Sequence, residues 1–228
     1  MPIPSRLNIR IILISVILAG VSCKKDDFKG EEMSSLCISN VVVGSSPIRL
    51  NSITGETVSY GNNRVFSVMT GQRKVVIYSI EDSVKPYYSS SVVFAKGSVY
   101  SLFVSGSYPV ADTLLIKENI PYRLDSTAGI RVINLCSNCP PVNVTLALSD
   151  HVLEFSNLSY RQVPEFKTYS ATAKNGLYNF QIRDSETGKV LVAYNLATPR
   201  FREVTLVLRG LKDGVGAGGL GVMRVNHY

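Results

Sequence analysis

The chain has 228 residues, of which 45% are hydrophobic and 18% are charged, with 24 basic against 17 acidic side chains. This apolar content excludes an intrinsically disordered protein, and 17 glycines with 10 prolines exclude collagen-like and low-complexity chains. The length allows one or two domains of ordinary size. Because the positive charges are scattered along the chain, we interpret them as favouring solubility and expect no nucleic-acid partner.

The first 22 residues have the pattern of an export signal. Arg6 and Arg10 precede an uncharged apolar run, 11–21, which is too short to cross a hydrocarbon core that needs about 20 residues. A basic segment, a short apolar segment and small residues before a cleavage point are typical of a secretory signal. Cys23 follows at once, so the sequence predicts a lipidated cysteine or, as the alternative, an ordinary cleaved signal with an incidental cysteine.

This segment resembles a bacterial lipoprotein signal, although Gly20 stands where the usual box has leucine. The resemblance implies that residues 1–22 are removed and that Cys23 is acylated, and two or more acyl chains hold a protein stably on a membrane. The charges that follow are similar to the export signal of Bacteroidetes lipoproteins: Lys24, Lys25, Asp26 and Asp27. We therefore expect an outer-membrane protein at the cell surface, and a solvated spacer on a periplasm-facing protein is the alternative.

Residues 23–34 are predicted to be the lipidated cysteine and a polar tether. After them, the sequence predicts an all-β chain of two tandem immunoglobulin-like antiparallel β-sandwich domains. We find no trustworthy helical spacing of apolar residues, whereas period-two alternation recurs at 142–148, 178–183 and 204–209. Such alternation puts one face of a strand in a core and the other largely in water. Leu148, for example, is expected on the core face with Val142.

The two halves of the chain are similar to each other. Residues 38–40 and 47–50 match 132–134 and 141–144 with a shift of 94, and residues 100–106 match 204–210 with a shift of 104. Variation in loop length accounts for the difference between the shifts. We expect a duplicated domain, with a diverged first sandwich and a second one at these bounds: 35–125 and 129–228.

The second half resembles the domain-of-unknown-function family 4397. The similar elements are an R-x-x-N strand, a proline loop with an alternating strand, a strand ending in Arg-Gly and a Gly-rich loop: 131–134, 140–146, 204–210 and 214–222. The resemblance is weaker over 34–120. It implies immunoglobulin-like modules in exported proteins, with no established activity and no catalytic residues. The family's proline loop usually lacks cysteines, and here it carries two.

Cys136 and Cys139 form a C-x-x-C pair for which the sequence predicts a turn disulfide, since an exported protein meets an oxidising compartment. A disulfide between Cys37 and one of them is an alternative. A zinc site would need four ligands, and a redox pair would need a helix N-terminus to activate its thiolate. Neither requirement is met by the surrounding sequence, so we expect no metal and no cofactor.

Other motifs have ordinary interpretations. Residues 214–219 satisfy G-x-G-x-x-G, but a terminal strand follows where a dinucleotide site needs a helix, so we expect a hairpin loop. His151 lies between Asp150 and Glu154 without a nucleophile motif, and we interpret all three as solvated loop residues. We expect no catalytic residues.

Two further groups are candidates for surface recognition. The first is a group of aromatic residues: Tyr87, Tyr88, Tyr100, Phe103 and Tyr108. About half of them are expected in the core, and the rest could form a contact surface. Three Asp-(Ser/Thr)-x triplets resemble Bacteroidetes O-glycosylation acceptors in loops or strand ends: Ser83, Thr113 and Ser126.

Together these features favour a lipid-anchored, non-catalytic binding or adhesion module at the outer-membrane surface, with a glycan or an envelope protein as its partner. A structural accessory subunit of an outer-membrane or periplasmic complex is the alternative, and an enzyme is the least favoured hypothesis. Because β-sandwiches host many functions, the fold does not name the ligand.

Overall fold

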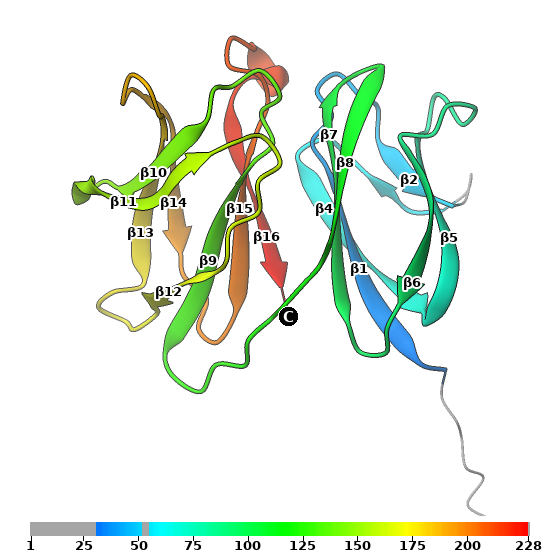
Figure 1. Ribbon diagram of the computed structural model, residues 1–228, viewed down its shortest axis with the longest axis horizontal. Helices are drawn as coiled ribbons and strands as arrows, with labels where there is room; N and C mark the ends of the chain where they lie inside the picture. The colour runs from blue at the N-terminus through cyan, green and yellow to red at the C-terminus, as the bar shows by residue number, and fades with distance from the viewer. Residues whose placement is uncertain (1–30, 52–54, 228) are drawn as a thin grey trace, which may run out of the picture. The chain divides into compact units, whose positions relative to one another are not determined.

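The computed structural model describes residues 31–51 and 55–227, and the regular secondary structure of this part of the chain is almost entirely β-strand (Figure 1). The expected all-β fold class is confirmed. From Glu32 onward the chain forms one compact unit. The predicted export signal, Cys23 and the charged residues 24–27 lie outside the described residues. Within the described ranges, no helix is long and apolar enough to cross a membrane.

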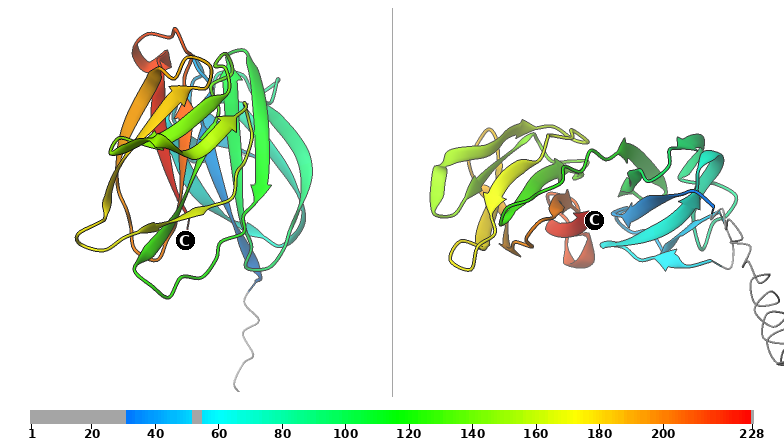
Figure 2. Two further views of the ribbon diagram at one scale, coloured as in Figure 1. Left: turned by 60° about the vertical axis from the view of Figure 1, so that its left-hand side comes forward. Right: turned by 90° about the horizontal axis from the view of Figure 1, so that it is seen from below.

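In the described part of the first half, the strands pair into two sheets with the orders β4-β1-β7-β8 and β3-β2-β5-β6. Neighbouring strands are antiparallel except for β1 and β7, which run parallel and can be followed in blue and green in Figure 2. The strands are β1 (Met33–Asn40), β2 (Ile48–Leu50), β3 (Thr57–Val58), β4 (Asn62–Met69), β5 (Gly71–Ser79), β6 (Tyr88–Phe94), β7 (Val99–Ser107) and β8 (Val110–Lys117).

The second half repeats this arrangement strand for strand, with the sheet orders β12-β9-β15-β16 and β11-β10-β13-β14. Each strand takes the place of the strand eight positions earlier, and the parallel pair is now β9 with β15. The strands are β9 (Thr127–Asn134), β10 (Val142–Leu146), β11 (Ser149–Leu158), β12 (Lys167–Ser170), β13 (Leu177–Asp184), β14 (Val190–Ala197), β15 (Glu203–Arg209) and β16 (Gly221–His227).

The strand registers agree with both sequence shifts. Asn40 pairs with Val104 across the first parallel pair, and Asn134 pairs with Leu208 across the second. Asn134 lies 94 positions after Asn40, and Leu208 lies 104 positions after Val104, which are the two shifts found in the sequence. The duplication therefore extends from the sequence to the hydrogen-bonded pairing of the strands.

Each half encloses its own apolar core between its two sheets. In the first half Leu36 and Leu102 pack with Ile77 of the opposite sheet. In the second half Ile130 and Leu206 pack in the same way with other fully buried side chains, Phe180 among them. The alternating side chains predicted to face a core do so in β13, where Phe180 and Ile182 are buried. Burying such side chains is the main stabilising contribution to a sandwich of this size.

A third apolar cluster draws side chains from both halves, with Phe103 and Cys37 on one side and Ile133, Val207 and Met223 on the other. This cluster explains a departure from the sequence prediction. The second face of β15 was expected largely in water, yet Val207 and its neighbour Thr205 are fully buried. The shared cluster covers that face, so β15 is buried on both sides.

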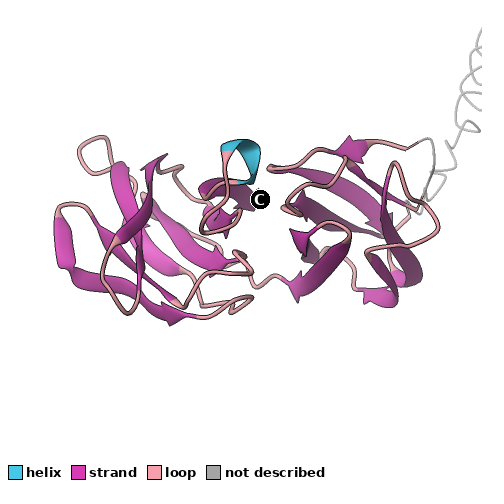
Figure 3. Cartoon of the chain, turned by 90° about the horizontal axis from the view of Figure 1, so that it is seen from above, coloured by secondary structure: helices cyan, strands magenta, loops and turns pink. Residues whose placement is uncertain are grey.

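The glycine motif at 214–219 lies in the loop between β15 and β16, as predicted. Its only regular structure in the described chain is a short 3₁₀ turn, Gly216–Gly218, drawn in cyan in Figure 3. Gly210 opens this loop with a φ of +91°, and a Cβ atom there would lie 2.1 Å from the carbonyl oxygen of Gly219. The loop thus needs glycine for its own close packing.

Candidate binding site

A hollow of about 540 Å³ lies in the second sandwich, beside the turn that joins β10 to β11. We call it the amide groove. It is formed by the turn at 146–149, by residues 174–179 leading into β13, and by Asn195 of β14. Its volume falls within the range of about 300–1,000 Å³ that small-molecule sites occupy.

One part of the groove lining is apolar. Leu146 and Tyr178 are half-buried and pack against the core of the second sandwich, so they are fixed in place. Leu148 and Leu177, by contrast, are 99% and 72% exposed. An isolated exposed leucine is ordinary, but two beside a hollow with half-buried neighbours form an apolar contact surface.

The position of Leu148 corrects the sequence prediction. The alternation at 142–148 placed it in the core, but β10 ends at Leu146 and β11 begins at Ser149. Ala147 and Leu148 therefore form the turn, where the alternation of a strand no longer applies. Apart from the alternation at 142–148 and at 178–183, the groove residues carry no functional motif in the sequence.

The other part of the lining is polar and carries side-chain amides. Asn179 and Asn195 are cross-strand partners, and Asn179 Nδ2 donates to Asn195 Oδ1 over 2.7 Å. Asn179 Oδ1 is shielded from solvent and accepts no hydrogen bond from the described residues. Lys174 and Asn175 are exposed at the rim. None of the described residues that line the groove is acidic.

The charged residues closest in sequence to the groove have other partners. Asp150 lies 3.7 Å from the Arg183 guanidinium, and Arg183 Nε donates to the hydroxyl of Thr145 over 3.1 Å. His151 is 81% exposed, and Glu154 accepts a hydrogen bond from the hydroxyl of Tyr169. Asp150, His151 and Glu154 lie in strand β11 and not in a loop as predicted, because the turn after β10 consists of Ala147 and Leu148 alone.

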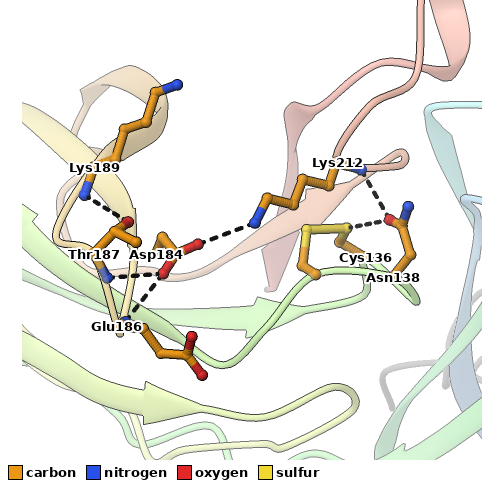
Figure 4. Close-up of polar contacts among 8 residues, drawn as sticks. Cys136, Asn138, Asp184, Glu186, Thr187, Lys189 and Lys212 are labelled. Carbon is orange, nitrogen blue, oxygen red and sulfur yellow. Dashed lines mark hydrogen bonds and ion pairs between the residues drawn. A yellow bond between two sulfur atoms is a disulfide. The ribbon is translucent and has the colours of Figure 1, made fainter.

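The predicted Cys136–Cys139 disulfide is confirmed (Figure 4). Cys37, by contrast, is a free, buried thiol. Burial raises the pKa of Cys37 to about 12, so it stays protonated and unreactive. Cys136 Sγ lies 3.3 Å from Asn138 Oδ1, which also accepts a hydrogen bond from the Lys212 backbone N–H over 2.8 Å. The disulfide turn is thus joined to the β15–β16 loop.

Asp184 also contacts the β15–β16 loop, through the side chain of Lys212, as Figure 4 shows. The backbone N–H groups of Thr187 and Glu186 donate to its Oδ1, and Lys212 Nζ donates to its Oδ2 over 3.1 Å. These hydrogen bonds, led by that of Thr187, lower the pKa of Asp184 to about 2. With both its oxygens engaged, this carboxylate holds two loops together.

A buried charge network lies between residues of the two halves. Arg131 Nη2 donates to Glu118 Oε1 over 2.7 Å, and both side chains are at most 5% exposed. Arg131 Nε and His227 Nε2 both contact the Thr205 hydroxyl, at 2.9 and 2.8 Å. Burial lowers the pKa of His227 to about 4, so its imidazole is neutral at pH 7.

A second hollow, of about 590 Å³, follows the segment 118–123 that leads from β8 toward β9. Its charged side chains are already paired, since Glu118 binds Arg131 and Arg123 Nε donates to Glu203 over 2.6 Å. These charges hold the fold together. The amide groove, whose polar groups are largely free, is therefore the better candidate site.

The remaining predicted surface residues are dispersed. Ser83 is exposed and Ser126 half-buried in bends, as expected, but Thr113 lies in the middle of β8, where Arg161 donates to its carbonyl oxygen. As expected, part of the aromatic group lies in the core, and Tyr87 and Tyr88 are half-buried against it. Tyr100 and Phe103 are core residues, whereas Tyr108 is 51% exposed. Strand pairing decides this difference, because β7 is buried on both faces.

No protein-family model matches the sequence, and no curated protein matches it. Among solved structures, the chain is similar to the C-terminal domain of AlgF from P. aeruginosa, at 17% identity and a TM-score of 0.31, over 39% of this chain and 100% of that domain. A second similar structure is a family CBM26 module of Eubacterium rectale Amy13K in complex with maltoheptaose, at 9% identity and a TM-score of 0.24, over 85% of this chain and 97% of the module. With such low TM-scores, neither likeness bears on the function of this chain.

Proposed function

We propose that this chain is a cell-envelope lipoprotein that acts as a non-catalytic binding or adhesion module at the outer-membrane surface. The observation that carries the binding role is the amide groove, a hollow of ligand size with exposed leucines and free amides. Its asparagine pair, Asn179 and Asn195, lies on the paired strands β13 and β14, which fix the geometry of these amides better than loops would. Membership of family 4397, with domains at 35–125 and 129–228, forms part of the proposal.

The anchoring half of the proposal rests on the N-terminal sequence. A basic segment, a short apolar run and Cys23 together support acylation, which would tether the sandwiches to a membrane. Metabolic labelling with a fatty acid tests this directly. We expect label in the wild-type protein and none in Cys23→Ala, which should leave the membrane fraction. Label that survives Cys23→Ala would contradict the lipid anchor.

Surface exposure rests on the acidic residues after the cysteine and is tested by protease treatment of intact cells. The wild-type protein should be degraded, whereas Asp26→Ala with Asp27→Ala should be protected. If both proteins are protected, the chain faces the periplasm, and the accessory-subunit hypothesis is then favoured over surface adhesion.

The binding role is tested with the full-length lipidated protein in detergent. We expect it to bind glycans on an array or to bind intact cell envelopes saturably, without consuming the ligand. Reproducible turnover in a hydrolase panel, abolished by His151→Ala or Asp150→Ala, would overturn the non-catalytic role. A stoichiometric envelope protein with no other ligand would instead favour an accessory subunit.

A further inference from the structure

We infer that the amide groove binds a carbohydrate, with sugar hydroxyls on the asparagine amides and the apolar face of a sugar ring on Leu148 and Leu177. This inference rests on the proposed function and names its class of ligand. It begins with the amides. A side-chain amide offers both donors and an acceptor, as a sugar hydroxyl offers a donor and acceptors, so three asparagines in one hollow match a hydroxyl-rich ligand.

The bonding of the amide pair leaves capacity for such a ligand. The contact from Asn179 to Asn195 uses one N–H and one oxygen, so the Asn195 amide keeps both of its N–H donors. Asn179 Oδ1 lacks a donor among the described residues. Because this oxygen is shielded from solvent, the amide groups of the pair that a ligand hydroxyl can reach are the N–H donors of the exposed Asn195. Asn175, exposed at the rim, adds a third amide.

The apolar side of the groove fits the same ligand. Sugar rings carry C–H groups on their faces, and burying them against leucine side chains is favourable in proportion to the area removed from water. Leu148 and Leu177 are exposed and adjacent to the amides, so one ring can meet both surfaces. A purely apolar ligand such as an acyl chain would bury the amides without hydrogen bonds, which is unfavourable.

The charge of the groove limits which ligands fit it. Lys174 is the one charged residue among the described residues that line it. A phosphate-rich ligand such as a nucleotide is poorly matched by a single exposed cation. A neutral oligosaccharide is matched by the amides alone, and one bearing a carboxylate gains a solvent-exposed ion pair with Lys174. Such pairs contribute little, so we expect a preference of at most about fivefold for the acidic sugar.

The test uses the full-length lipidated protein in detergent on an array of neutral and uronic-acid oligosaccharides, followed by titration calorimetry with the best glycan found. Asn195→Ala removes an exposed amide, and Leu148→Ser removes the exposed leucine of the turn. We expect each to weaken binding about five- to tenfold with little change in the melting temperature. Lys174→Ala should remove the preference for uronic acids.

Matched controls carry the same kinds of substitution elsewhere. Asn119→Ala changes an exposed asparagine outside the groove, and Leu124→Ser changes a leucine that is 86% exposed. Both should bind within twofold of the wild type. Glycan binding that survives both groove substitutions would overturn the groove as the site but leave the proposed binding function standing. No glycan binding, together with saturable binding to envelopes, would overturn the carbohydrate inference alone, and the absence of both would overturn the proposed function as well.

Discussion

The two sandwiches keep the same internal scaffold but differ in the chemistry that they place on it. Asn134 Oδ1 accepts from the Cys136 N–H over 3.0 Å and its Nδ2 donates to the Leu158 carbonyl over 3.2 Å. Asn40 makes the corresponding bonds in the first half, from the Val42 N–H at 3.2 Å and to the Val58 carbonyl at 3.1 Å. A buried asparagine that satisfies two backbone groups is hard to replace, and both halves retain it.

The contact between the halves is also reciprocal. Tyr60 OH accepts from Arg209 of the second half, and Tyr160 OH shares a hydrogen bond with Ser105 of the first. Tyr60 and Tyr160 follow the same strand in each half, and Ser105 and Arg209 are separated by the repeat shift of 104. Equivalent surfaces that meet each other are the pattern of an isologous interface. The two halves of this one chain thus meet as the two subunits of a symmetric dimer would.

The same positions carry different chemistry where the two halves diverge. Arg131 occupies the position of Cys37, and the amide pair Asn179 and Asn195 corresponds to the cross-strand pair Lys74 and Ser91. The scaffold therefore teaches little about function. Function has to be sought in the side chains that differ between the two halves.

The largest expected effect on stability comes from the buried ion pair between Arg131 and Glu118. The first half has no equivalent of it, because Cys37 stands at the position of Arg131. Arg131→Ala should lower the free energy of unfolding by about 3–5 kcal/mol, because it leaves the Glu118 carboxylate buried without its partner. Chemical denaturation measures this loss. Arg64→Ala is the control, since its ion pair with Glu56 is exposed, and its cost should stay below about 1 kcal/mol. Equal losses in the two variants would show that the buried pair is not a special contact.

Replacing both partners separates pairing from packing. Arg131→Met with Glu118→Leu removes the buried charges together and keeps apolar volume at the contact. This double variant should regain most of the stability that Arg131→Ala loses. A double variant as unstable as Arg131→Ala would mean that the hydrogen bond to Thr205 matters more than the ion pair.

His227 should make stability depend on pH in the acidic range. Its folded pKa is about 4 against an ordinary value of 6.5, so between these values the unfolded chain binds more protons than the folded one. Stability should therefore fall as the pH drops from about 6.5 to 4, by about 3 kcal/mol in total. Denaturation at several pH values compares wild type with His227→Gln, which does not titrate there. Parallel pH profiles for the two proteins would contradict this assignment.

Loss of the shared asparagine should lower the free energy of unfolding by the same amount in both halves. Asn40→Ala and Asn134→Ala each leave a buried N–H and a buried carbonyl unpaired, which costs about 2 kcal/mol. Asn119→Ala, in an exposed position, should be neutral. Costs that differ by more than about 1 kcal/mol would mean that the two scaffolds are energetically unlike despite their geometry.

The smallest effect is expected for the disulfide. Cys136 and Cys139 stand where the first half has Val42 and Ser45, and both turns keep the same backbone hydrogen bond, at 3.3 and 3.2 Å. Cys136→Val with Cys139→Ser therefore copies a turn that already folds without a cross-link. Because a four-residue ring removes little chain entropy, the loss should not exceed about 2 kcal/mol. The shift in melting temperature measures it, and loss of the folded state would show that the turn depends on the bond.

The sequence alone was sufficient to predict the all-β class and the duplication, and it favoured the Cys136–Cys139 disulfide over a pairing with Cys37. Period-two alternation follows from strand geometry, which is local, and the repeat shifts require only pairwise comparison of residues. The cysteines lie three positions apart in a turn, so their pairing is local as well. These features do not depend on which distant segments meet.

Only the tertiary structure decided what covers β15, where Leu148 lies and how Glu118 meets Arg131 and His227. The second face of β15 is buried by residues from the other half of the chain, and alternation within one strand carries no information about such a neighbour. Leu148 turned outward because β10 ends two residues earlier than the alternation suggests. The amide groove joins residues 146–149, 174–179 and 195, and segments so far apart in sequence are brought together only by the register of three paired strands.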